Sequence, residues 1–93
     1  MKSRQRTRPP THPGEILREE FLIPLRLTQK QLADHVGCDV KVINRIVNGA
    51  RITVPMARRL AAAFGTTPEF WLTLQMEVDL YEEQQRDTDL PGL

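Results

Sequence analysis

Apolar residues recur at helical spacing in five successive segments of the chain, and a proline, a glycine or a capping residue separates each segment from the next. The first of them ends or kinks at Pro24. The segments predicted to be helical are 12–24, 28–37, 39–49, 53–65 and 67–81. Because each carries an apolar face, the pattern predicts an all-α, five-helix domain whose helices pack those faces together. Leu25 and Leu27 are expected to pack inward on either side of an exposed Arg26.

The second and third helical segments have the clearest boundaries. Thr28 and Gln31 match a capping box, and Gly37 follows the last apolar residue, where a left-handed turn ends a helix. Asp39 is an acceptable N-cap for the next helix, which stops at Asn48-Gly49. Two short helices joined by a tight glycine turn are typical of a helix-turn-helix motif, here at residues 28–48, which presents its second helix to the major groove of DNA.

One face of that second helix is polar and basic. Its polar residues lie at positions i, i+3, i+4 and i+7, opposite the apolar Ile43, Ile46 and Val47. Arginine and lysine bind guanine edges, asparagine binds adenine, and an apolar side chain meets the thymine methyl group. The predicted base-reading residues are Val40, Lys41, Asn44 and Arg45. The predicted phosphate contacts are Gln29, Asn48 and Arg51. The alternative is a small helical bundle with an ordinary solvated basic face.

Charge is segregated along the chain, although the formal net charge is only +1. Residues 26–59 carry seven basic side chains against two acidic ones, whereas residues 69–93 carry seven acidic side chains against one arginine. A basic middle and an acidic end suggest two different partners, one of them polyanionic. Around the folded domain at 12–81, we expect a disordered basic arm at 1–11 and an acidic flexible tail at 82–93.

Several classes of protein are excluded by length and composition. A chain of 93 residues forms one small domain without room for an enclosed substrate pocket, and no run of eighteen apolar residues is present to span a membrane. Cys38 is the only cysteine, which indicates a reducing cytoplasm. His12, His35 and Cys38 do not make a zinc site, so the cysteine is interpreted as structural and no metal is expected. No catalytic set is apparent, so we expect neither an enzyme, nor a cofactor, nor a small-molecule substrate.

The fifth segment has more apolar residues than one helix face needs. Packing beneath the first and fourth helices, a dimer seam and a site for a protein partner are all open interpretations. The predicted dimer contacts are Trp71, Leu74, Val78 and Tyr81. A dimer is also expected from DNA geometry, because one short helix reads few base pairs and a two-fold pair places two such helices about 34 Å apart.

Four blocks of the sequence resemble the HigA-type antitoxins, a branch of the lambda-repressor-like (Xre) helix-turn-helix family. They are HPGEILREEFLIPL at 12–25, LTQKQLADHVG at 27–37, NRIVNGARIT at 44–53 and RLAAAFGTTPEFWLTLQMEVDL at 59–80. The first and last of these blocks are more diagnostic than the helix-turn-helix alone. The sequence departs from the family pattern at Cys38-Asp39, where an apolar residue followed by serine or threonine is common. Asp39 brings a carboxylate close to where phosphates would lie.

The resemblance implies a bacterial cytoplasmic protein that dimerises, binds a double-stranded operator palindrome at the nucleoid and represses its own operon. It also implies a HigB-type toxin partner similar to RelE-type mRNA endonucleases. In the family, a glutamine at the position of Gln29 contacts phosphate, and the positions of the four predicted base-reading residues face the bases. The alternatives are a stand-alone Xre-family repressor without a toxin and a pure protein-interaction module.

Overall fold

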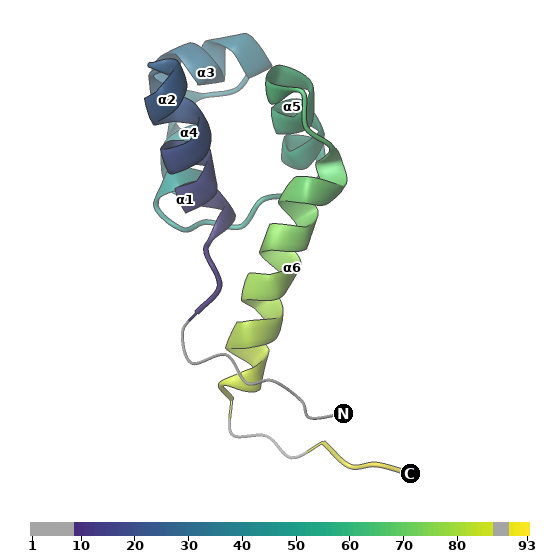
Figure 1. The fold of residues 1–93 in the computed structure, drawn as a ribbon. Coiled ribbons are helices and arrows are strands. Elements are labelled where there is room, and N and C mark those ends of the chain that lie inside the picture. The colour runs from purple at the N-terminus through teal and green to yellow at the C-terminus, as the bar shows by residue number, and fades with distance from the viewer. Residues whose placement is uncertain (1–8, 87–89) are drawn as a thin grey trace.

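The computed structural model of the protein describes residues 9–86 and 90–93, so most of the predicted basic arm and part of the predicted tail lie outside the described residues. An N-terminal helical stretch is continuous through three parts: α1 (Pro13–Ile16), a π-helical segment η1 (Leu17–Leu22) and α2 (Ile23–Leu25). It is followed by α3 (Gln29–Val36), α4 (Val40–Val47), α5 (Val54–Phe64) and α6 (Pro68–Gln84) (Figure 1). The described part of the chain contains no strand, and the predicted five-helix, all-α architecture is confirmed.

The N-terminal stretch is shaped by its prolines and by one glycine. His12 caps it, with Nδ1 accepting a hydrogen bond from the backbone N–H of Gly14 at 2.9 Å. A proline ring within a helix crowds the carbonyl four residues earlier. That residue, Glu20, lies in the wider π-helical segment, which makes room for Pro24. The helix ends one residue after Pro24, at Leu25, and is followed by Arg26, whose φ of 53° is left-handed.

Leu25 does not pack inward as the sequence predicted. Its side chain is 59% exposed, because Leu25 ends α2, the part of the N-terminal stretch that has no buried residue. Leu27 is half-buried against the core, and its backbone N–H donates to the carbonyl of Leu22 at 2.9 Å. The predicted inward position is therefore right for Leu27 and wrong for Leu25.

Gly14 lies at the point where α1 crosses α4. A Cβ atom at Gly14 would stand 1.8 Å from the carbonyl oxygen of Ile46 and 3.1 Å from the Cα of Val47. Both of those atoms belong to backbone, so neither can move aside as a flexible side chain would. The helix that carries the polar stripe is thus braced by direct backbone contact with α1.

The core is formed by apolar side chains from every helical stretch. Its fully buried members include Leu17, Leu32, Ile43, Leu60 and Trp71. The ring of Trp71 packs 5.4 Å from Phe21 and 5.1 Å from Phe70 between centroids, the second pair edge to face. Its indole Nε1 donates to Thr66 Oγ1 at 2.8 Å, which satisfies the buried N–H.

Two residues of the predicted dimer seam belong to this core instead. Trp71 is 0% exposed and Val78 is 8% exposed, so neither has surface to offer a second copy, while Leu74 and Tyr81 are half-buried. Helix α6 also continues three residues beyond Tyr81, to Gln84. Its C-terminal half projects away from the rest of the bundle (Figure 1). Across the described residues, no helix combines the length and apolarity needed to cross a membrane.

Candidate nucleic-acid interface

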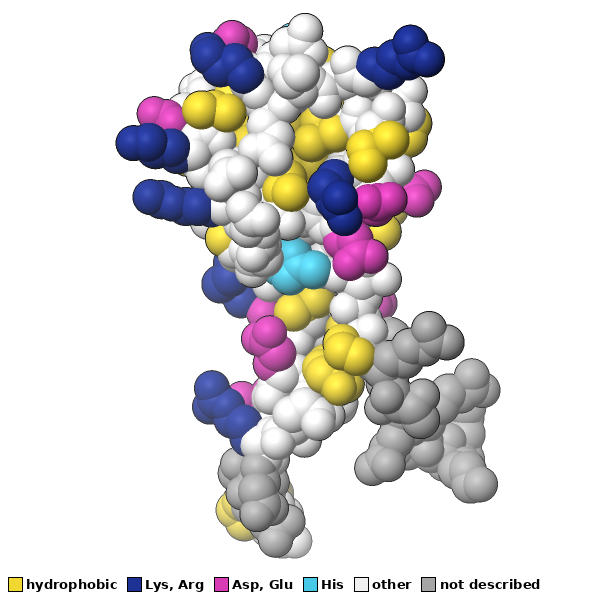
Figure 2. All heavy atoms as spheres, turned by 90° about the vertical axis from the view of Figure 1, so that its left-hand side faces the viewer, with side chains coloured by type: hydrophobic (Ala, Val, Ile, Leu, Met, Phe, Trp, Pro, Cys, Tyr) yellow, Lys and Arg dark blue, Asp and Glu magenta, His cyan; other side chains and the backbone are white. Residues whose placement is uncertain are grey.

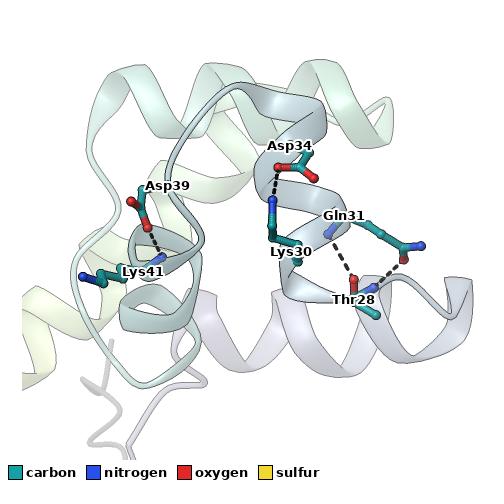
Figure 3. Close-up of polar contacts among 6 residues, drawn as sticks. All are labelled: Thr28, Lys30, Gln31, Asp34, Asp39 and Lys41. Atoms are coloured by element: carbon teal, nitrogen blue, oxygen red, sulfur yellow. Dashed lines mark hydrogen bonds and ion pairs between the residues drawn. The ribbon is translucent and has the colours of Figure 1, made fainter.

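The helix-turn-helix consists of α3, a three-residue turn and α4. Thr28 and Gln31 form the predicted capping box, in which Thr28 Oγ1 accepts from the N–H of Gln31 at 3.0 Å and Gln31 Oε1 accepts from the N–H of Thr28 at 2.9 Å (Figure 3). Gly37 has a φ of 79°, a conformation that only glycine adopts without strain. The N–H groups of Gly37 and Cys38 both donate to the carbonyl of Ala33, which closes the end of α3.

The side chain of Asp39 forms the N-cap of α4. Its Oδ1 accepts a hydrogen bond from the backbone N–H of Lys41 at 2.8 Å, and the side chain of Lys41 extends away from it (Figure 3). A carboxylate at this end of a helix is stabilised by the helix dipole. The departure from the family pattern at Asp39 is therefore compatible with a well-formed α4.

The four residues of the polar stripe lie on one exposed face of α4. Lys41, Asn44, Arg45 and Asn48 are all exposed, whereas Ile43 and Ile46 on the opposite side are buried. Val40 is half-buried at the edge of the stripe. The spacing in the sequence thus correctly predicted which side chains α4 presents to solvent.

A chain of amide hydrogen bonds links the polar stripe to α3. Asn44 Nδ2 donates to Gln29 Oε1 at 3.1 Å, and Asn48 Nδ2 donates to Asn44 Oδ1 at 3.2 Å. Each amide group keeps further donors or acceptors, since an amide nitrogen carries two protons and a carbonyl oxygen two lone pairs. The beginning of α3 and the length of α4 therefore present one continuous polar surface.

Arg51 has a partner that its sequence neighbourhood did not indicate. Its Nη1 donates to Asp79 Oδ1 of α6 at 2.6 Å. The hydrogen bond from Arg51 lowers the pKa of the Asp79 carboxyl. Burial acts to raise this pKa, and a second hydrogen bond, from Gln75, acts to lower it. Gln75 also accepts a hydrogen bond from the buried backbone N–H of Ile52 at 2.9 Å. The spacing of Gln75 and Asp79, one turn apart on α6, was the available signal for these two residues, and sequence reasoning missed it.

Cys38 has the environment of a structural thiol. It is half-buried against the core, and this burial raises the pKa of the thiol. His35 on α3 is exposed. Among the residues that the structure describes, no three histidine, cysteine, aspartate or glutamate side chains are grouped as metal ligands would be.

A second exposed surface lies on the side of the molecule that carries α1, α2 and α4. Figure 2 shows Lys and Arg side chains along one edge of this side and hydrophobic side chains reaching the surface between them. Ile23 and Leu25 of α2 are 56% and 59% exposed. A groove of about 390 Å³ begins at Leu25 and runs between α3 and α5 to Phe64. Exposed apolar residues beside a groove are typical of a protein-binding surface.

The chain is similar over most of its length to proteins of known class. The helix-turn-helix family pattern matches residues 17–71. Antitoxin HigA-1 of Vibrio cholerae is 43% identical over 83 residues, which cover 89% of this chain and 79% of that protein. YbaQ of Escherichia coli strain K12, an uncharacterized HTH-type transcriptional regulator, is 45% identical over 80 residues, covering 85% and 71% respectively. The solved structure of Pseudomonas aeruginosa antitoxin HigA with the higBA promoter has a TM-score of 0.76 at 33% identity and covers 86% of this chain and 96% of that one.

The fold and the exposed polar stripe define a DNA-binding protein of the helix-turn-helix class. Within that class, the chain belongs to the HigA-type antitoxin family. The family resemblance that the four sequence blocks indicated is confirmed, and with it the lambda-repressor-like fold. Gly14, in the first of those blocks, is explained by its backbone contact with α4.

Proposed function

We propose that this protein is the antitoxin of a type II toxin–antitoxin module, acting in the bacterial cytoplasm. In this proposal it binds and neutralises a HigB-type, RelE-like mRNA endonuclease, and as a dimer it binds its own operator palindrome and represses the operon. The observation that carries the DNA-binding part is the exposed stripe of Lys41, Asn44, Arg45 and Asn48 on α4. Support for the antitoxin part comes from the family, which includes Antitoxin HigA-1 and an antitoxin HigA solved with its promoter.

Within this proposal, α4 is the recognition helix. Lys41 and Arg45 bind guanine edges in the major groove, Asn44 binds adenine and Val40 contacts a thymine methyl group. Gln29 and Asn48 bind phosphate at either end of the amide chain through Asn44. Arg51 binds phosphate from the loop that follows α4. Because several phosphates are neutralised, we expect operator affinity to fall steeply as salt rises.

Replacing Arg45 with alanine is expected to weaken operator binding by about 1–3 kcal/mol and to relax the base preference at one position in each half-site. The physical reason is that a bidentate arginine–guanine pair is lost without a change in the fold, because Arg45 is exposed. Titration of the gene's own upstream DNA, with single-base variants of the half-site, measures both effects.

Arg58→Ala is the matched control for Arg45→Ala, because Arg58 is an exposed arginine on α5 outside the recognition helix. It removes the same charge and is expected to retain the base preference. If the Arg45 and Arg58 variants had the same affinity for every half-site sequence, Arg45 would not read a base.

The exposed apolar face of α6 is the better candidate for the dimer seam. Leu72, Met76 and Leu80 are spaced at i, i+4 and i+8, with Met76 53% and Leu80 52% exposed and Leu72 half-buried. Val54, at the start of α5, is 57% exposed. Residues 51–54 and α6 enclose a groove of about 440 Å³, and Val54, Leu72 and Met76 contribute to its lining. We propose that a second copy covers Leu72, Met76 and Leu80 in place of Trp71 and Val78, and that it leaves the side of the groove lined by Arg51 and Asp79 open.

Met76→Glu is expected to convert the dimer to a monomer, because it places a carboxylate in the middle of the apolar seam. Sedimentation or light scattering at a fixed protein concentration measures the change in mass. Ala62→Glu, at an exposed position of α5, adds the same charge elsewhere and should leave the dimer intact. A Met76→Glu protein that remained dimeric would rule out this face as the seam.

The toxin surface is proposed from charge and from the exposed apolar groove. Toxins that cleave RNA are often basic. Two acidic regions of this chain are available to them: Glu15, Glu19 and Glu20 of the N-terminal stretch, and residues 69–93. The product of the adjacent gene is the test of this function. An RNA-cleaving protein that is inhibited when mixed with this chain supports the antitoxin role. If the neighbouring gene encodes no such protein, the chain is a stand-alone repressor, the alternative that likeness to a transcriptional regulator favours.

A further inference from the structure

A hydrogen-bonded cluster ties the loop after α4 to α6. Gln75 is only 3% exposed, although glutamine is normally a surface residue, and both ends of its amide are used. Its Oε1 accepts from the backbone N–H of Ile52 at 2.9 Å, and its Nε2 donates to Asp79 Oδ1 at 3.1 Å. Arg51 donates to that same oxygen at 2.6 Å. Two residues one turn apart on α6 therefore hold both the backbone and the arginine of this loop.

The loop is also continuous with the recognition helix. The backbone N–H of Ala50 donates to the carbonyl of Arg45 at 2.8 Å, and that of Gly49 to the carbonyl of Ile46 at 3.0 Å. Ile52, the next residue after Arg51, is 2% exposed and anchored in the core. Arg51 is thus fixed on both sides by backbone contacts, and only its side chain has freedom to be oriented.

The ion pair leaves the guanidinium of Arg51 able to bind another anion. Arginine has five N–H donors in a planar fork, and the contact with Asp79 uses Nη1. The side chain of Arg51 is 67% exposed, so its remaining donors are accessible from solvent. A guanidinium held by a carboxylate on one edge can receive a phosphate oxygen on another edge.

We propose that Gln75 and Asp79 are positioning residues for operator binding: α6 holds Arg51 where its free donors meet a DNA phosphate beside the recognition helix. This inference rests on the proposed function, in which Arg51 contacts the operator backbone. An arginine that is already ordered loses less side-chain entropy when it binds. Repulsion between the Asp79 carboxylate and DNA opposes this gain in affinity. The repulsion is small because Arg51 neutralises the carboxylate and because salt screens surface charge beyond about 8–10 Å.

The test is operator affinity of Asp79→Ala against Glu82→Ala. Glu82 is an exposed acid on the next turn of α6, so its removal gives the same change in charge and corrects for general attraction to DNA. Asp79→Ala is expected to bind the operator about 3- to 10-fold more weakly than Glu82→Ala, which corresponds to freeing one long side chain. Because Asp79 is not a core residue, far-ultraviolet circular dichroism is expected to be unchanged.

The same comparison in an Arg51→Ala background separates positioning from a structural role. With Arg51 absent, Asp79→Ala and Glu82→Ala are expected to bind equally well, because there is no guanidinium left to orient. If Asp79→Ala bound as tightly as Glu82→Ala, or more tightly, the ion pair would restrain Arg51 and the proposal would be overturned. If Arg51→Ala had no effect while Arg45→Ala did, the phosphate contact of Arg51 would fail and operator binding through α4 would stand.

Discussion

Gly14→Ala is expected to destabilise the protein by about 3 kcal/mol or more, a large part of the roughly 5–15 kcal/mol that stabilises a typical domain. The new methyl group would stand 1.8 Å from the carbonyl oxygen of Ile46, so α1 and α4 would have to separate. For a domain of this size, the melting temperature should fall by roughly 12–24 °C. Thermal unfolding followed by far-ultraviolet circular dichroism measures the change, at one protein concentration because a dimer melts in a concentration-dependent way.

Gly92→Ala provides a matched control for Gly14→Ala. It is the same substitution at a glycine around which no atom lies within 4 Å of an added Cβ, so its melting temperature should equal that of the parent protein. The folded fraction of the Gly14 variant should also bind the operator less well, because the contact that is lost braces the recognition helix. Equal melting temperatures for the two variants would mean that α1 does not cross α4 as closely as described.

Trp71→Ala is expected to cost about 3–5 kcal/mol of folding free energy, the range for removing a fully buried aromatic side chain. The substitution removes the ring contacts with Phe21 and Phe70 and opens a cavity between the N-terminal stretch and α6. It also leaves the hydroxyl of Thr66 without its indole partner. Urea unfolding followed by circular dichroism gives the value. Tryptophan fluorescence cannot report it, since Trp71 is the only tryptophan.

Phe70→Ala is the companion measurement for Trp71→Ala. Phe70 is the neighbouring aromatic residue on the same helix but is 40% exposed, so its truncation should cost clearly less. A Trp71 variant that unfolded like the parent but had become monomeric would restore this residue to the dimer seam. A large loss of stability with an unchanged mass for the folded fraction would agree with its place in the core.

Local features of the sequence were enough to predict the helices and the polar stripe. The capping box of Thr28 and Gln31 and the left-handed Gly37 involve residues at most a few positions apart. The exposed face of α4 follows from helical periodicity, which needs only the 3.6-residue repeat. Those signals are physical properties of short segments, and the predicted capping box, glycine turn and exposed face are all present in the structure. The base and phosphate roles assigned to these residues remain proposals.

The face that α6 turns inward was not determined by its sequence. Its apolar residues cover more than one side, so periodicity allowed either the stripe with Trp71 and Val78 or the stripe with Met76 and Leu80 to face solvent. Packing against Phe21 and against α5 selects the first stripe for the core. Trp71 and Val78 of the predicted seam are buried because burial depends on what the other helices cover, and a dimer contact through Leu74 and Tyr81 stays a prediction.

The chain by itself thus determined the helix-turn-helix of residues 28–48, because its boundaries and its polar face are set by neighbouring residues. Only the tertiary structure decided how that motif is supported. The contact of Gly14 with Ile46 and the ion pair of Arg51 with Asp79 join residues about 30 positions apart. No local pattern encodes such contacts, since they arise when α1 packs against the recognition helix and α6 against the loop that follows it.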